Sequence, residues 1–155
     1  SLEGTPADML CRMPAPHANS MAWTAWHLTR VQDDHISDLA ELPELWTSAG
    51  WHTRFDMEPD DAETGQGHTF DEVAAFKVES AEVLLAYQDA VYERSKEYLA
   101  GLNPADLVRE LDEPQYDPLP TVGVRLVSIV SDNTQHAGQV AYLRGYFEEK
   151  GWGRA

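Results

Sequence analysis

The chain has 155 residues, of which 43% are hydrophobic, and a formal net charge of −16 at pH 7. This length suits one domain with a real core, so we expect residues 1–155 to form a single domain, and the charge argues against nucleic acid or anionic membranes as partners. A single cysteine, Cys11, excludes an intramolecular disulfide, and no apolar run approaches the roughly 20 residues of a membrane span, so we expect a cytoplasmic protein.

Near the beginning of the chain, "EGTPADML" (residues 3–10) resembles "GLNPADLV" (residues 101–108). Each has a cap residue, Thr5 or Asn103, followed by a proline at the first helical position. Gly101 closes a long predicted helix just before the second copy. By analogy Gly4 closes a helix too, and we expect the body of that helix to precede the given sequence.

Three long helices are predicted after this. The first covers residues 19–42 and begins at an asparagine N-cap; the second covers residues 69–101 and begins with a capping box formed by Thr69 and Glu72. The third covers residues 121–150. Between the first two lies a polar segment without periodicity, residues 50–68, which predicts a long loop of the kind that forms lids or mobile segments.

Two residues on the last helix could bind one ion together. Asp132 and His136 are four residues apart, so they share a helix face, and Gln139 continues that face. A third ligand must come from a neighbouring helix, and His27, midway along the tryptophan-rich first helix, is the best candidate. Two histidines and one carboxylate leave the coordination sphere open, which is typical of a catalytic metal site.

Each of these residues also has a structural interpretation. A lone histidine on an apolar helix is most often a hydrogen-bonded core residue, and a lone aspartate is most often solvated. Gly138 suggests close packing against another helix as readily as function. Asp34 is aligned with His27 but lies two turns away, so a contact with a ligand or substrate fits it better than direct metal binding.

Two segments carry a family resemblance. "NSMAWTAWHLTRVQDDHI" (residues 19–36) and "SDNTQHAGQVAYLRGYF" (residues 131–147) resemble the two signature helices of the DinB-like superfamily, which includes the YfiT-like proteins and the mycothiol-dependent maleylpyruvate isomerases of actinobacteria. The resemblance implies an all-α, up-down four-helix bundle whose first helix is missing from this chain. His27, His136, Gly138 and Gln139 match the family pattern. Asp132 departs from it, because many members have histidine there and the isomerases have glutamate.

The resemblance implies a function as well. We expect a divalent metal, zinc first and nickel or iron as alternatives, bound by His27, Asp132 and His136, with Gln139 and Asp34 contacting the bound groups. A low-molecular-weight thiol such as mycothiol or bacillithiol would be the cosubstrate of a transferase or isomerase acting on a small electrophile, in a homodimer. Two alternatives stay open: a non-enzymatic metal- or ligand-binding stress protein, and a helical interaction module without metal.

Overall fold

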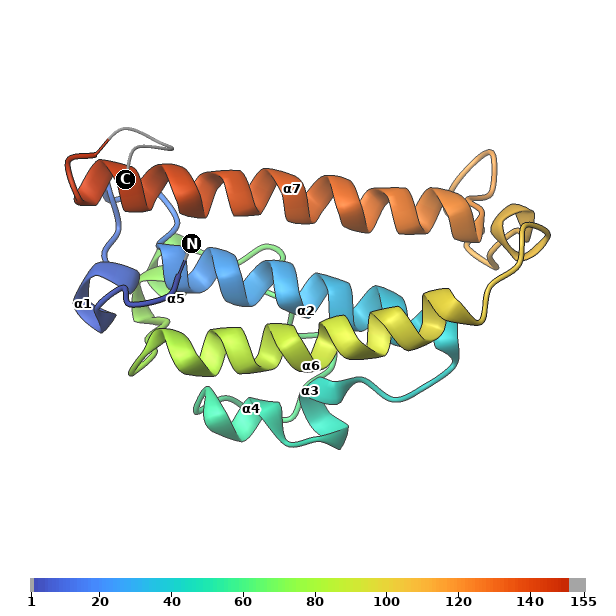
Figure 1. Ribbon diagram of the computed structural model, residues 1–155, viewed down its shortest axis with the longest axis horizontal. Helices are drawn as coiled ribbons and strands as arrows, with labels where there is room; N and C mark the ends of the chain where they lie inside the picture. The colour runs from blue at the N-terminus through green and yellow to red at the C-terminus, as the bar shows by residue number, and fades with distance from the viewer. Residues whose placement is uncertain (1, 151–155) are drawn as a thin grey trace.

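The computed structural model describes residues 2–150, which form helices joined by loops (Figure 1). The helices are α1 (Ala7–Leu10), α2 (Met21–Ala40), α3 (Leu45–Ser48), α4 (Trp51–Arg54), α5 (Phe70–Ala75), α6 (Ala81–Ala100), the 3-10 turn η1 (Asp106–Val108) and α7 (Val122–Phe147). These residues form no β-strand, only an isolated bridge between Glu110 and Thr121, so the predicted all-α class is confirmed. None of the described helices is long and apolar enough to cross a membrane.

Helix α2 is the central element, with α7 packed on one side and α6 on another (Figure 1). Fourteen of its twenty residues are buried, so most of its circumference is in contact with the rest of the chain. The helix starts after Ser20, whose hydroxyl accepts the N–H of Trp23, and not at the predicted cap Asn19. Helix α7 starts where predicted, because the hydroxyl of Thr121 accepts the N–H of Val124.

The connection between α2 and α6 differs from the prediction in two ways. Helices α2 and α6 run in the same direction, and only α6 and α7 follow the expected up-down order (Figure 1). The predicted loop at residues 50–68 also contains the helical turn α4. Trp51 and Phe55 are buried there, since both aromatic rings pack against Tyr87 of α6, so the segment is anchored to the core.

The prediction of one continuous helix over residues 69–101 is wrong, because the chain is not helical between α5 and α6. The capping box of Thr69 and Glu72 is present, but α5 ends at Ala75 and Phe76 has extended backbone angles. Phe76 and Val78 are buried while Lys77 and Glu79 are exposed, the alternation of an extended segment. Two side chains two residues apart point to nearly opposite sides of a helix. Burial of both Phe76 and Val78 in the core therefore requires an extended backbone here.

The repeated Pro-Ala-Asp segments also form less helix than expected. The first makes only the single turn α1, and the hydroxyl of Thr5 caps nothing: it is buried without a hydrogen-bond partner. In the second, the side chain of Asn103 accepts the N–H of Ala105, and Asp106 accepts the N–H of Asn103. These bonds form a turn before η1, which begins only at Asp106 with Ala105 as its N-cap and no side-chain cap, so the predicted cap at Asn103 is wrong.

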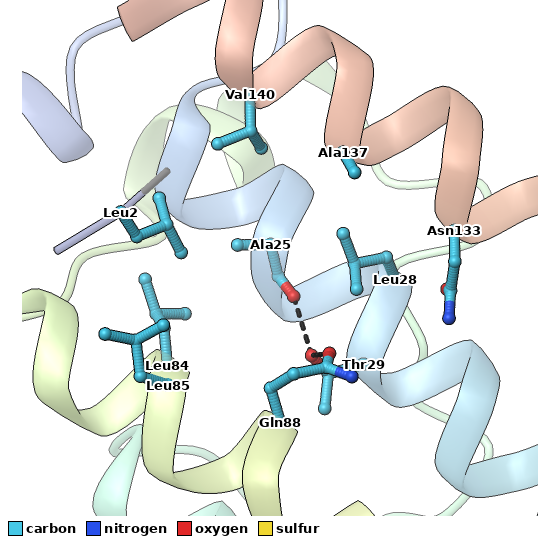
Figure 2. A pocket seen from close by; sticks show the side chains of 10 residues that line it. All are labelled: Leu2, Ala25, Leu28, Thr29, Leu84, Leu85, Gln88, Asn133, Ala137 and Val140. Atoms are coloured by element: carbon cyan, nitrogen blue, oxygen red, sulfur yellow. Dashed lines mark hydrogen bonds between the residues drawn. The ribbon is translucent and has the colours of Figure 1, made fainter. Parts of the chain in front are cut away.

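A pocket of about 270 Å³ lies between α2, α6 and α7 (Figure 2). Its walls are the apolar residues Leu2, Ala25, Leu28, Leu84, Leu85, Ala137 and Val140. Its polar end contains Thr29, Gln88 and Asn133, where the Asn133 amide donates to Gln32 at 2.7 Å. Leu2 is buried against this groove, so the described chain begins at the groove between the long helices.

A buried guanidinium ties the long connection to α2. Arg30 is fully buried, and it donates to the carboxylate of Glu44 (2.6 Å), the hydroxyl of Tyr87 (3.2 Å) and the carbonyls of Asp61 (2.8 Å) and Glu63 (3.0 Å). Each of these acceptors except Tyr87 belongs to the segment between α2 and α5. The segment is therefore held at several points by one side chain of α2.

Asp33, one turn further along α2, holds the same segment from the other side. Its carboxylate is fully buried and accepts the N–H groups of Leu45 and Trp46, at 3.1 and 2.8 Å, and the hydroxyl of Tyr87 at 2.7 Å. These two N–H groups begin α3, whose own N-cap residue, Glu44, makes no side-chain cap. Asp33 thus satisfies a helix N-terminus 12 residues away in sequence.

Glu44 should make stability depend on pH. Burial raises the pKa of Glu44 from 4.5 to about 7, more than the nearby Arg30 lowers it. Because the folded pKa is the higher one, the carboxyl contributes its full stability below about pH 4.5 and loses it as the pH rises through 7.

Glu44→Gln keeps an acceptor for Arg30 but cannot ionise. In urea titrations between about pH 5 and pH 8, the free energy of unfolding of the native protein should fall relative to that of this variant. Glu97→Gln, at an exposed position of α6, is the matched control and should follow the native profile. Parallel profiles for the native protein and Glu44→Gln would contradict the prediction.

Candidate metal centre

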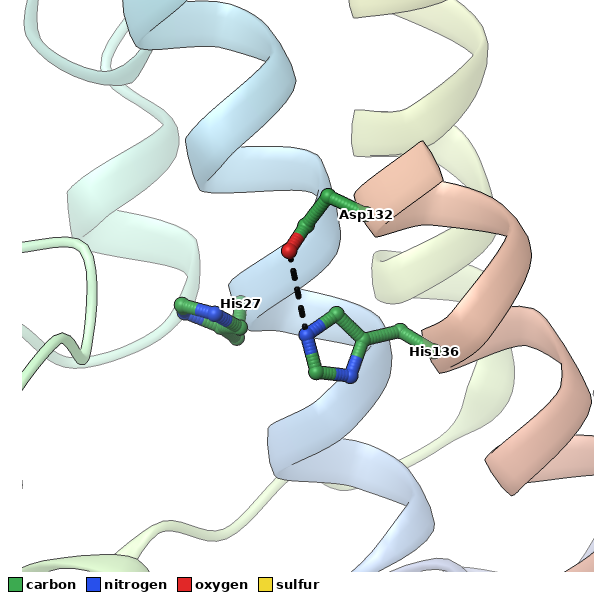
Figure 3. Close-up of side chains that lie close together, drawn as sticks. All are labelled: His27, Asp132 and His136. Atoms are coloured by element: carbon green, nitrogen blue, oxygen red, sulfur yellow. Dashed lines mark ion pairs between the residues drawn. The ribbon is translucent and has the colours of Figure 1, made fainter. Parts of the chain in front are cut away.

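Three predicted ligands lie together between α2 and α7. One ligand atom each from His27, Asp132 and His136 lies within 4.8 Å of the others. Nε2 of His136 is 3.4 Å from Oδ1 of Asp132, and the two imidazole rings are nearly perpendicular with centroids 5.1 Å apart. Figure 3 shows both side chains of α7 directed toward His27. The i, i+4 spacing places the α7 pair on one face, and the packing of α7 on α2 supplies the third residue.

Hydrogen bonds orient both histidines. Nδ1 of His27 lies 2.6 Å from the carbonyl oxygen of Thr64, and Nδ1 of His136 lies 2.9 Å from Oε1 of Gln139. A backbone carbonyl can only accept, so Nδ1 of His27 carries the proton and its Nε2 keeps its lone pair. Metal-binding histidines are usually oriented in this way, by a carbonyl or carboxylate on the other ring nitrogen.

Burial and charge also suit a cation. Oδ2 of Asp132 is buried and has no hydrogen-bond partner, an unusual condition for a carboxylate oxygen. Burial lowers the pKa of His27 below its usual 6.5, so its imidazole is neutral at neutral pH. Two imidazoles and one carboxylate form a donor set that fits zinc, nickel or iron, and these residues therefore fit the implied metal.

The carbonyl of Thr64 is held in place by its own segment. Gly65 has φ +83°, and a Cβ there would lie 2.7 Å from Trp26 and 2.9 Å from Trp23, so only glycine fits between the backbone and these rings. Trp23 in turn stacks on the ring of His27, with centroids 4.9 Å apart. The residues around Thr64 thus pack directly on the face of α2 that carries His27.

His68 is a residue whose importance the sequence did not show. Its Nδ1 accepts the indole N–H of Trp23 at 3.0 Å, and its Nε2 lies 3.0 Å from the carboxylate of Glu63. This pair connects the loop to the tryptophan beneath it, next to His27. The local sequence is polar and aperiodic, so no pattern distinguishes His68 from a solvated loop histidine.

The remaining predicted residues take different positions. Gln139 contacts the site through His136, whereas Asp34 lies beside His35, 3.7 Å from its Nδ1, and is not part of the three-residue cluster. Burial raises the pKa of Asp34. The close helix contact expected of Gly138 is wrong: a Cβ there would meet nothing within 4 Å, because no described residue packs on this face of α7.

A second pocket, of about 350 Å³, adjoins the cluster through Gln139. Its lining residues are Pro14, His17, Ala18, Asn19, Thr24, Gln139, Tyr142 and Leu143. The floor is apolar and the polar groups are an imidazole, two amides and hydroxyls, so the pocket suits a small, partly polar molecule. His17, which the sequence gave no reason to select, belongs to this pocket and also packs on Phe70.

Comparison with protein families identifies one family for this chain. The sequence matches the family model of the DinB superfamily over residues 1–140. A crystal structure described as the conserved protein of locus from Enterococcus faecalis is 32% identical to this chain, with a TM-score of 0.83, and the match covers 91% of this chain and 82% of that chain. The comparison with curated proteins gives no match.

The tautomers can be read in solution by nitrogen-15 NMR of metal-free protein. His27 should show a protonated Nδ1 and a lone pair on Nε2. His68 provides an internal control, because it accepts from Trp23 at Nδ1 and should therefore be protonated at Nε2. Finding His27 in the same tautomer as His68 would contradict the hydrogen bonds described above.

Proposed function

This chain belongs to the DinB superfamily, and on that premise we propose that His27, Asp132 and His136 bind a divalent metal ion, with zinc first and nickel or iron as alternatives. One observation carries the proposal. One ligand atom each of His27, Asp132 and His136 lies within 4.8 Å of the others between α2 and α7, and Oδ2 of Asp132 is buried without a hydrogen-bond partner. A buried carboxylate oxygen normally has a partner, and a cation bound by these three residues would supply it.

We further propose that the protein is an enzyme that uses a low-molecular-weight thiol of the mycothiol or bacillithiol type. A divalent ion held by His27, Asp132 and His136 would keep an open position, where it would supply Lewis-acid chemistry and lower the pKa of a bound thiol. Support comes from the resemblance of residues 19–36 and 131–147 to the helices of mycothiol-dependent proteins. The reaction would be transfer or isomerisation of a small electrophile.

The side chains around the cluster have definite parts in this proposal. Thr64 accepts the Nδ1 proton of His27 and so keeps its Nε2 available, and Gln139 orients the ring of His136 through its Nδ1. Trp23 covers one face of His27 and excludes water from it. The pocket that contains His17 and Tyr142 offers room for the electrophile or for the body of the thiol beside Gln139.

The contribution of Asp132 can be measured by metal titration. Asp132→Ala should weaken zinc binding by at least about 10- to 100-fold. This is the loss expected for residues that only orient metal ligands, so it is a lower bound for a ligand itself. Asp132→His should retain binding, because imidazole also binds zinc. Asp34→Ala is the matched control and should leave affinity nearly unchanged, since Asp34 lies outside the cluster. Isothermal calorimetry on tag-free protein would overturn the assignment if binding depended on Asp34 and not on Asp132.

The thiol proposal needs a separate kinetic test. Zinc-loaded protein should accelerate the reaction of mycothiol or bacillithiol with a fluorogenic electrophile such as monochlorobimane. Chelated protein and His136→Ala should both lose the acceleration. If the loaded native protein binds zinc with high affinity but accelerates neither thiol, the thiol proposal fails and the non-enzymatic metal-binding alternative stands.

A further inference from the structure

The pocket of about 350 Å³ beside the metal cluster is lined without any aspartate, glutamate, lysine or arginine. Its polar groups are an imidazole, two amides and two hydroxyls, from His17, Asn19, Thr24, Gln139 and Tyr142. In the chain as a whole, 25% of the residues are charged and the net charge is −16. The absence of charge from this lining sets the pocket apart from most of the protein surface.

The pocket adjoins the proposed ion site. It lies where the segment before α2 runs beside the C-terminal half of α7 (Figure 1). Thr24 lies one turn before His27 on α2, and Gln139 lies one turn after His136 on α7. Oε1 of Gln139 is 2.9 Å from Nδ1 of His136, so this amide belongs to both the pocket and the cluster. A molecule held at the ion site therefore has room to extend into the pocket.

Positive charge near the pocket is directed elsewhere. The guanidinium of Arg12 lies over the ring of Phe147, 4.8 Å from its centroid, and Arg144 pairs with a glutamate four residues further along α7. The N-terminal end of α2 is also close, but its first two residues, Met21 and Ala22, are fully buried. Their N–H groups are therefore inaccessible to an anion that enters the pocket.

Uncharged groups in the pocket are available to a ligand. Among residues 2–150, the side chains of His17 and Asn19 and the hydroxyl of Tyr142 make no hydrogen bond with the protein. The amide of Gln139 uses only its oxygen, which leaves both N–H groups of its nitrogen free to donate. Imidazole, amide and phenol groups can each form hydrogen bonds with the hydroxyl or amide groups of a ligand.

We infer that the molecule bound beside the metal is uncharged and carries hydroxyl or amide groups, and that His17, Asn19 and Gln139 select it. This inference rests on the proposed function, and it narrows the thiol to one without carboxylates. A carboxylate in the pocket would lose hydration without meeting a cation, and the acidic protein would repel it. A hydroxyl group loses less hydration and finds partners among the amides.

Binding to the metal-free protein tests the inference independently of catalysis. Methyl 1-thio-β-D-glucoside is an uncharged, hydroxylated probe, and 2-(methylthio)succinate is a dicarboxylate with the same thioether group. In NMR titrations the glucoside should shift the side-chain amide signals of Asn19 and Gln139, and the dicarboxylate should bind at least about tenfold more weakly. Equal or tighter binding of the dicarboxylate, or no shift of these two amides with the glucoside, would overturn the inference.

A lysine placed in the pocket should weaken the discrimination against anions. Asn19→Lys supplies the missing cation, so 2-(methylthio)succinate should bind this variant about tenfold more tightly than it binds the native protein. Gln115→Lys adds the same charge at an exposed position outside the pocket, and this matched control should bind the dicarboxylate like the native protein. An equal gain in both variants would reflect net charge alone and would contradict the assignment of the pocket.

Kinetics separate failure of this inference from failure of the proposed function. With zinc-loaded protein, the acceleration over the uncatalysed rate should be at least about tenfold greater for 1-thio-β-D-glucose than for mercaptosuccinate. Acceleration of mercaptosuccinate alone would overturn the inference and leave the thiol function in place. If neither thiol is accelerated, the thiol function fails, and binding of the methyl thioglucoside at Asn19 and Gln139 would still support an uncharged ligand.

Discussion

The buried guanidinium of Arg30 is the interaction on which the candidate site depends. It holds the carbonyls of Asp61 and Glu63, and the next carbonyl along the chain, that of Thr64, accepts the Nδ1 proton of His27. A buried charge is costly unless its hydrogen bonds are satisfied, and here several acceptors satisfy it. The loop that sets the tautomer of His27 is thus positioned by a residue one turn further along the same helix.

The site joins parts of the chain that are distant in sequence. His27 comes from α2, Asp132 and His136 come from α7, and Thr64 comes from the connection between α2 and α6. The three ligands can meet only after α7 has packed on α2, so their geometry follows from the tertiary structure. Helix α2 contributes residues to this site, to the aromatic core and to the buried Arg30 network, so few of its residues are exposed.

The sequence predicted those features that depend on regular helical spacing. The helices α2 and α7 and the shared face of Asp132 and His136 are examples, because a helix repeats its faces whatever it packs against. Features set by the core were not predictable in this way. The helix break before Ala81 follows from the burial of Phe76 and Val78, and the contact of Thr64 with His27 spans 37 residues. Gly138 was misinterpreted because a helical glycine alone does not reveal which face is covered.

The position of Thr64 in a loop affects how long an ion would stay bound in the site. Segments without regular secondary structure open locally far more often than packed helices do. Whenever the segment around Gly65 lifts from Trp23 and Trp26, the imidazole of His27 loses the acceptor that fixes it and can rotate, while Asp132 and His136 stay on their helix. The residence time of an ion in this site would then be governed by the opening rate of one loop, independently of how slowly the helical bundle itself unfolds.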